Sequence, residues 1–183
     1  MSIEIERKFL VANDGWKASV VKISRIRDGL VVSENGRKVR VRILEDGATL
    51  AIKGPRIGLA RHEYEYKIPT SEAEEILRTM CAGRHLEKVR HYVPHAGVMW
   101  EINVYEGLLE GIVIAEVELD REDRQLELPN WVGEEVTGDE RYSKASMERE
   151  RLRVRPGGRI VSFRPTHTGP SQCASLSWYE AFS

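Results

Sequence analysis

The chain has 183 residues, the length of one domain or of one domain with an appendage. Its 28 Lys and Arg residues and 29 Asp and Glu residues give a formal net charge of −1, so we expect neither nucleic acid nor a membrane as a partner. The sequence has no apolar run of roughly 20 residues, no recognisable signal peptide, and two cysteines without disulfide or metal spacing, so we expect a cytoplasmic protein.

Charged residues recur at every second position in seven segments of the chain. Successive side chains of a strand point to opposite faces, so each segment reads as a strand with one charged and one mostly apolar face. In chain order the polar or charged faces are Glu4/Glu6/Lys8, Lys38/Arg40/Arg42, Thr49/Ala51/Lys53, Arg61/Glu63/Glu65/Lys67, Lys88/Arg90, Glu101/Asn103 and Glu116/Glu118/Asp120.

The segment between the first two of these strands is less regular. Residues 11–22 are ambiguous between a turn and a short helix. Residues 23–33 read as extended, with a break at Asp28-Gly29. Asn35-Gly36 then marks a hairpin, because Asn and Gly accept positive φ at low cost. We therefore expect antiparallel neighbours joined by short turns.

Two helices are expected beside the strands. Ser71 and Glu74 have the spacing of a capping box, and Gly83 suits the end of the helix that follows. The apolar residues of this helix recur at helical spacing, at Ala73, Ile76, Leu77 and Met80. We predict that it covers part of the apolar outer face of the sheet. Residues 140–151 are a second, mostly polar candidate.

Composition changes near Pro156. Residues 156–183 are rich in Gly, Ser, Thr and Pro and have no hydrophobic period. We therefore expect one domain over residues 1–155, followed by a flexible C-terminal tail over 156–183. The sequence does not establish whether this tail is native.

Two architectures explain the charged strand faces. An open antiparallel sheet turns one such face to water, whereas a closed barrel holds it in a lumen. The density of Arg and Glu favours the barrel, and so do three Glu-x-Glu pairs, because like charges on one strand face repel unless cations lie beside them. We predict a mainly β, α+β fold: an eight-stranded antiparallel barrel with a charged lumen and a few outer helices.

A lumen of this kind brings many acids and bases together. Ion pairing alone explains it poorly, since the cost of desolvation offsets the attraction between buried charges. Arginines and lysines that converge from several strands suit an anion with several oxygens. Carboxylates suit hard divalent cations such as Mg²⁺ or Mn²⁺. The residues therefore predict a complex of a polyphosphate with divalent metal.

The segment Glu4-Ile5-Glu6-Arg7-Lys8 resembles the Glu-x-Glu-x-Lys hallmark of the CYTH, or triphosphate tunnel metalloenzyme, superfamily. The resemblance covers roughly residues 2–150 and is strongest to the short bacterial inorganic triphosphatases. It implies an eight-stranded tunnel that hydrolyses inorganic triphosphate with two divalent ions, Mg²⁺ or Mn²⁺. Whether the protein is a monomer or a homodimer stays open. Further matching segments follow in order at 39–43, 51–55, 61–66, 87–92, 115–119 and 131–137.

The resemblance also implies a role for each residue of the lumen. Glu4, Glu6 and Glu118 are expected to bind the metal that activates water, and Glu116 the metal that bridges the phosphates. Lys88 is expected to orient the attacking water. The expected substrate-binding residues are Lys8, Arg40, Arg42, Lys53, Arg61 and Arg90, and the expected tunnel network is Glu63, Glu65, Glu101 and Asn103.

Other functions stay open beside inorganic triphosphatase: class IV adenylate cyclase, thiamine-triphosphatase, and a polyphosphate-binding module without catalysis. The complete Glu-x-Glu-x-Lys set favours catalysis, and no adenine pocket is evident. The chain also departs from its relatives at three positions. Leu30 stands where Tyr is frequent, Asn103 where Asp is frequent, and Lys144 where Asn is usual.

Overall fold

The computed structural model describes residues 3–81 and 84–153. The expected tail and Gly83 therefore lie outside the described residues. The strands are β1 Ile3–Val11, β2 Lys22–Glu34, β3 Arg37–Leu44, β4 Gly47–Lys53, β5 Ala60–Ile68, β6 Leu86–His95, β7 Val98–Glu106, β8 Val113–Glu118 and β9 Val132–Glu135. They form one sheet, in the order β5-β4-β3-β2-β6-β7-β8-β1-β9.

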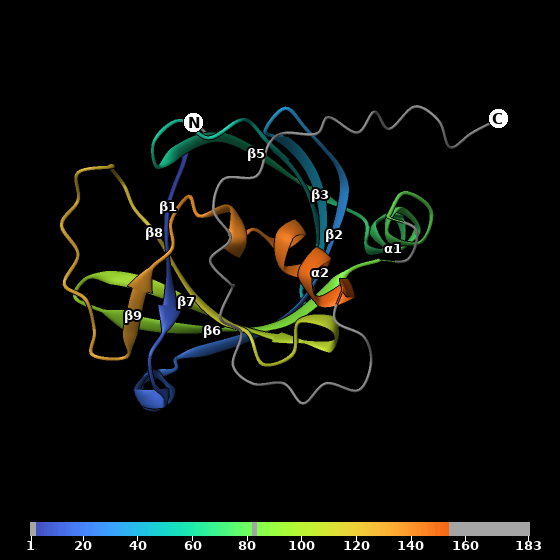
Figure 1. The fold of residues 1–183 in the computed structure, drawn as a ribbon. Coiled ribbons are helices and arrows are strands. Elements are labelled where there is room, and N and C mark those ends of the chain that lie inside the picture. The colour runs from blue at the N-terminus through green and yellow to red at the C-terminus, as the bar shows by residue number, and fades with distance from the viewer. Residues whose placement is uncertain (1–2, 82–83, 154–183) are drawn as a thin grey trace.

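The sheet closes on itself through β1. Residues Ile3 to Ile5 pair with β5, and Glu6 to Leu10 pair with β8, both antiparallel. The pairing with β5 joins the two ends of an eight-stranded sheet, and β9 adds an extra strand beside the end of β1. Figure 1 shows the resulting ring of strands. The predicted eight-stranded barrel is thus confirmed, and the open sheet is excluded.

The outer faces of the strands carry most of the hydrophobic core. One cluster centres on Trp16, Trp100 and Trp131, which pack outside β1, β7 and β8. Trp16 comes from the 3-10 helix η1 (Asp14–Ser19), which resolves the ambiguous segment after β1. Burying such large aromatic side chains contributes strongly to stability, so the apolar outer face is covered while the charged face stays inside.

Helix α1 (Thr70–Thr79) covers another part of the outer face, as predicted. Its Ala73 and Leu77 are buried against β3 and β4. The predicted capping box is wrong, since the helix begins one residue earlier and its N-cap, Pro69, has no side-chain hydrogen bond. Glu74 instead makes an ion pair with Arg27 on β2, and that contact draws its carboxylate away from the backbone.

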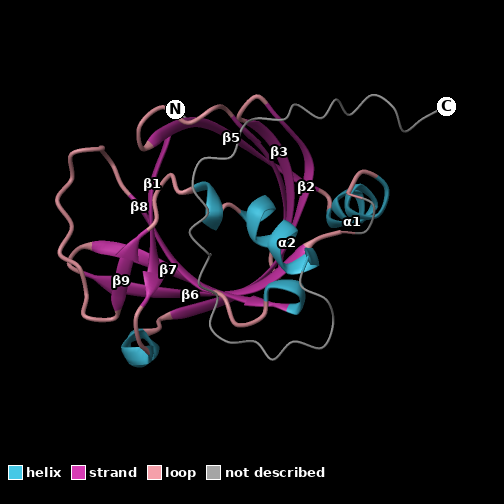
Figure 2. Cartoon of the chain, in the orientation of Figure 1, coloured by secondary structure: helices cyan, strands magenta, loops and turns pink. Residues whose placement is uncertain are grey.

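Helix α2 (Lys144–Arg153) corrects the expectation that all helices are outer ones. It lies within the outline of the ring in Figures 1 and 2, and its side chains line the barrel's cavity. Its Met147 is buried with Tyr142 of η3 (Glu140–Tyr142), Leu109 of η2 (Gly107–Leu109) and Tyr105 of β7. This apolar cluster closes one end of the lumen. The helices of the described ranges 3–81 and 84–153 include none that is long and apolar enough to span a membrane.

The predicted break at Asp28-Gly29 is also wrong. Strand β2 runs unbroken from Lys22 to Glu34, pairs with β3 through both residues of this dipeptide, and pairs with β6 as far as Asp28. Glycine is required at position 29 for steric reasons, since a Cβ there would lie 2.3 Å from Cδ2 of Leu77 on α1. The glycine thus allows close packing of helix on strand, and Asp28 points to the inner face.

Candidate active site

The barrel encloses a cavity of about 1260 Å³. Strands β3 and β8 lie opposite each other in the eight-strand ring, so the arginines of β3 face the glutamates of β8 across the lumen. Asn103 lies behind the lining and is fully buried. The other residues proposed from the sequence all line the cavity: Glu4, Glu6, Lys8, Arg40, Arg42, Lys53, Arg61, Glu63, Glu65, Lys88, Arg90, Glu101, Glu116 and Glu118.

Glu116 on β8 is the centre of a buried network. Nζ of Lys8 lies 3.0 Å from its Oε1, and Nδ2 of Asn103 donates to its Oε2 at 2.8 Å. Arg90 approaches the same Oε2 at 3.5 Å. Burial opposes the charge of this carboxyl, but Lys8, Lys88 and Arg90 hold its pKa well below the ordinary value. Glu116 is therefore a carboxylate at neutral pH.

Glu4 on β1 belongs to a second network. Nζ of Lys53 lies 2.8 Å from Oε1 of Glu4 and 2.8 Å from Oε2 of Glu63. Arg61 donates to the other oxygen of Glu4. Burial disfavours the charged form, yet Arg61 and Lys53 lower the pKa of Glu4 below its ordinary value. This predicted metal ligand is thus held by two cations in the structure.

Glu6 and Glu118 face each other directly across β1 and β8. The nearest cation to Glu6 is Arg56, at 3.6 Å. Within the described parts of the chain, no hydrogen bond or ion pair reaches the Glu118 carboxylate. Burial raises the pKa of Glu118 to about 6, and the neighbouring Glu101, Glu4 and Glu6 act in the same direction. Glu118 is therefore the carboxylate of this corner that has no cationic partner among the described residues, whereas Glu6 has Arg56.

A divalent cation fits this corner by chemistry. All the available donors are carboxylate oxygens, which suit Mg²⁺ or Mn²⁺, and the repulsion around Glu118 is what such an ion would relieve. The carboxylates are not preassembled, since no cluster of three or more His, Cys, Asp or Glu side chains poised for a metal occurs among residues 3–81 and 84–153. Binding would require Glu4 to exchange its contacts with Lys53 and Arg61 for the ion.

We predict that Glu118→Gln stabilises the metal-free protein above pH 6. The raised pKa means that the folded state holds this proton more tightly than the unfolded chain does, so stability falls as the pH rises from about 4.5 to about 6. Glutamine removes that penalty. The gain is no more than about 1 kcal/mol, because Glu118 is surrounded by protein only in part: its side chain remains exposed to solvent, which screens the repulsion.

Urea unfolding in a chelating buffer checks this prediction at pH 7.5 and at pH 4.5. The difference between Glu118→Gln and the wild type should be much smaller at the lower pH, where the wild-type carboxyl is protonated in the folded state and about half protonated in the unfolded chain. An equal gain at both pH values would show that the repulsion between carboxylates is not its cause.

Asp28 on β2 is the main site residue that the sequence did not reveal. Its side chain is 2% exposed and lies among four cations. Oδ1 is 3.0 Å from Nε of Arg42 and 3.7 Å from Nε of Arg40. Oδ2 is 2.6 Å from Nζ of Lys144 and 3.8 Å from Nζ of Lys88. One carboxylate thus faces four cationic side chains and offsets only part of their charge.

Asp28 does not supply hydrogen bonds to all four cationic side chains. Nε of Arg40 and Nζ of Lys88 are buried and make no hydrogen bond within the described residues. Burial lowers the pKa of Lys88 well below the ordinary lysine value, and Lys144 and Arg90 add to this. Buried donors without partners are costly, so the arrangement fits an anion that brings several more oxygens.

Two further lining residues, Lys38 and Arg56, were not proposed as site residues from the sequence. Lys38 continues the alternation of Arg40 and Arg42, and burial, with Arg61 and other cations nearby, lowers its pKa. Arg56, in the loop after β4, donates to the backbone oxygen of Glu6. Only Lys38 carried a signal in the sequence, because a loop residue has no strand period to mark it.

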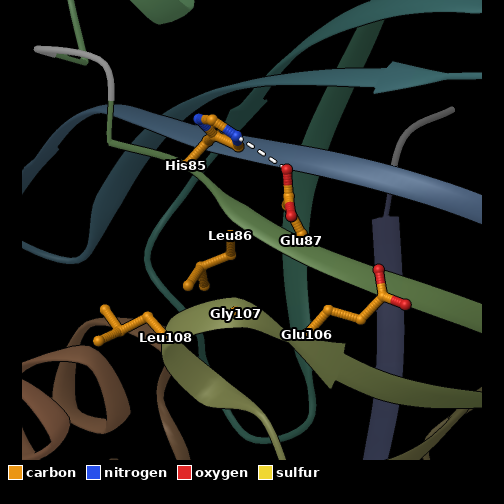
Figure 3. A pocket seen from close by; sticks show the side chains of 6 residues that line it. All are labelled: His85, Leu86, Glu87, Glu106, Gly107 and Leu108. Atoms are coloured by element: carbon orange, nitrogen blue, oxygen red, sulfur yellow. Dashed lines mark hydrogen bonds and ion pairs between the residues drawn. The ribbon is translucent and has the colours of Figure 1, made fainter.

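A second, smaller cavity of about 230 Å³ lies between the ends of β6 and β7. Figure 3 shows the His85 ring directed at the Glu87 carboxylate, 3.2 Å away, with Glu106 on the neighbouring strand. The lining includes two carboxylates and no lysine or arginine. This cavity therefore lacks the charge that a polyphosphate needs.

The geometry of the lumen agrees with comparisons to known proteins. The CYTH domain matches residues 2–151. The chain belongs to the CYTH domain family. The resemblance noted in the sequence is thus confirmed, and the charged barrel described above is the CYTH domain of this chain.

Two relatives and two solved structures extend this comparison. An inorganic triphosphatase of Acetivibrio thermocellus is 42% identical over 147 residues, 80% of this chain and 94% of that protein. One from Nitrosomonas europaea is 35% identical over 154 residues, 79% of this chain and 95% of that protein. A crystal structure of an inorganic triphosphatase has a TM-score of 0.56 and 32% identity, covering 79% of this chain and 97% of the other. The structure of a hypothetical protein from Pyrococcus furiosus has a TM-score of 0.52 and 18% identity. The match covers 66% of this chain and 80% of the other chain, and at this identity it shows the fold alone.

Proposed function

We propose that this chain is a divalent-metal-dependent inorganic triphosphatase that hydrolyses tripolyphosphate to pyrophosphate and phosphate inside the barrel. The observation that carries the proposal is one enclosed cavity with a cationic wall opposite a wall of carboxylates. The two named relatives, at 42% and 35% identity over most of their length, support it.

The cationic wall binds the substrate in this proposal. Arg40 and Arg42 project from β3, and Lys88 from β6, toward the same small region around Asp28. Arginine can bind two oxygens of a phosphate with a planar fork of donors. Nε of Arg40 makes no hydrogen bond within the described residues and would gain a phosphate oxygen. Together these groups hold the phosphates in one orientation and offset their charge as the terminal phosphoryl group leaves.

The carboxylate wall holds the metal ions. Glu4, Glu6 and Glu118 would bind one ion and Glu116 the second, and the choice between Mg²⁺ and Mn²⁺ belongs to the proposal. Bound divalent ions neutralise phosphoryl oxygens and lower the pKa of bound water. The contacts of Lys8 and Arg90 with Glu116 keep that carboxylate charged and oriented toward the lumen.

Lys88 orients the attacking water in this scheme. Its Nζ is buried, carries no hydrogen bond to the described protein groups, and belongs to the lining of the cavity. Burial, Lys144 and Arg90 lower the pKa of Lys88, so its amine can lose a proton and accept a hydrogen bond from the attacking water. We place this activity in the cytoplasm on the sequence argument alone.

A phosphate-release assay tests the proposed function. The purified chain would be incubated with tripolyphosphate, pyrophosphate, ATP or thiamine triphosphate, each with Mg²⁺ or Mn²⁺ and with a chelator as control. We expect tripolyphosphate to be the best substrate and the chelator to abolish turnover. Formation of cyclic AMP from ATP would instead identify the protein as an adenylate cyclase. Faster turnover of thiamine triphosphate than of tripolyphosphate would identify it as a thiamine-triphosphatase. Tight binding of tripolyphosphate without hydrolysis would leave a binding module.

A further inference from the structure

Lys144 enters the lumen from a helix and not from a strand of the barrel. It is the first residue of α2, and its Nζ lies 2.6 Å from Oδ2 of Asp28. The helix has a separate anchor, because Met147 is buried among Tyr142, Leu109 and other apolar side chains at the end of the barrel. The backbone near Lys144 is thus held in place without help from the ion pair.

The surroundings of Lys144 are strongly cationic. Arg40, Arg42 and Lys88 all lie within 3.8 Å of the same Asp28 carboxylate. Burial lowers the pKa of Lys144 to about 7, and Arg40 and Arg42 act in the same direction against the attraction of Asp28. A single carboxylate therefore faces four cationic side chains, and two of them keep buried donors without partners.

A lysine at this position contributes little to the stability of the fold, since burying its charge is costly. Lysine does, however, have a flexible four-carbon stem and three donors that rotate freely. Its side chain is 25% exposed, more than the 2% of Asp28, so it keeps room to move. A polyanion entering the lumen would offer Lys144 more negative charge than the shared carboxylate does.

We propose that Lys144 is a further phosphate-binding residue, which rests on Asp28 until the triphosphate enters and then transfers its hydrogen bonds to a phosphoryl oxygen. The inference rests on the proposed function, because it names the substrate of the same site. Asp28 in this view is a built-in counter-anion that keeps Lys144, Arg40 and Arg42 ordered in the empty lumen. Helix α2 supplies a substrate contact as well as closing the barrel.

The alternative is that Lys144 acts only through Asp28, as a structural tie between α2 and β2. A double-mutant cycle with Lys144→Met and Asp28→Asn separates the two roles, since it isolates the part of one effect that depends on the other residue. Steady-state kinetics would give KM and kcat for tripolyphosphate with metal. Calorimetry would give the affinity for tripolyphosphate without metal.

We expect Lys144→Met to raise KM by about tenfold, the effect of losing one charge-assisted hydrogen bond, with kcat within about threefold of the wild type. The same change in the Asp28→Asn background should again raise KM by about tenfold, because the phosphate contact does not need Asp28. Lys144→Arg should recover most of the affinity. Lys17→Met, which removes an exposed lysine from η1, should leave KM unchanged.

Two results would overturn the inference: a KM for Lys144→Met within twofold of the wild type, or no further rise in the Asp28→Asn background. Melting curves of all variants would exclude unfolding, and Lys144→Gln replaces Lys144→Met if the latter does not fold. If the wild type binds tripolyphosphate but does not hydrolyse it, the proposed function fails while the metal-free affinities still decide the role of Lys144.

Discussion

Replacing Arg42 by alanine is expected to lower kcat/KM for tripolyphosphate by about 10²–10³, the usual cost of removing one aligned electrostatic group from an active site. Nε of Arg42 lies 3.0 Å from Oδ1 of Asp28, and the side chain is only 14% exposed. Burial disfavours its charge, but Asp28 raises the pKa of Arg42, so the guanidinium is always charged.

Arg25→Ala is the matched control for this variant. Arg25 lies on the neighbouring strand β2, points outward, and pairs with Glu106 on the surface. Its loss should change kcat/KM by less than twofold. Arg42→Lys keeps the charge without the fork and should recover only part of the activity. A loss below about tenfold in a folded Arg42→Ala protein would show that the β3 arginines do not hold the substrate.

The barrel could be predicted from the sequence because the alternation of charged and apolar residues is visible within each strand. Charged side chains at every second position define a strand face. The density of Arg and Glu on those faces, such as Arg40 with Arg42, is higher than is usual for strand faces exposed to water, and it favoured a lumen. Closure itself depends on β1 pairing with both β5 and β8, which no local pattern specifies. The presence of the barrel was therefore predictable, whereas its register was not.

Asp28 escaped prediction because a local signal competed with a tertiary one. Asp-Gly is a common turn dipeptide, so the pair was read as a break in the strand. The actual reason for Gly29 is the side chain of Leu77, which lies 48 positions later in the sequence and packs against the strand only after folding. Had the strand been read as continuous, Asp28 would have fallen on the inner face with the other charges.

The contacts among the lumen residues depend on geometry that the sequence does not contain. Glu4 was expected to be a metal ligand, and the structure pairs it with Lys53 of β4 and Arg61 of β5. That pairing follows from strand register and rotamers. Lys144 was noticed only as a departure from related sequences, because a polar helix near the end of the domain gives no indication of which face enters the barrel.

Replacing Glu6 by glutamine is expected to abolish most of the metal-dependent turnover, by about 10² or more in kcat. Glu6 faces Glu118 directly across β1 and β8, and the carboxylates around Glu118 help to raise its pKa. Glutamine keeps the size of the side chain and removes one of the charges that attract a divalent ion. The concentration of Mn²⁺ that gives half-maximal activity should therefore rise as well, which a purely structural role would not cause.

Glu72→Gln on the exposed face of α1 is the control, since it makes the same chemical change far from the lumen. Mn²⁺ titrations of both variants and the wild type, at saturating tripolyphosphate, compare the metal requirement directly. Melting curves in a chelating buffer should show Glu6→Gln at least as stable as the wild type, because it loses a carboxylate that adds to the repulsion on Glu118. A folded Glu6→Gln protein with full activity and an unchanged Mn²⁺ requirement would show that the metal does not bind at Glu6. The proposal that Glu6 and Glu118 together hold an ion would then be wrong.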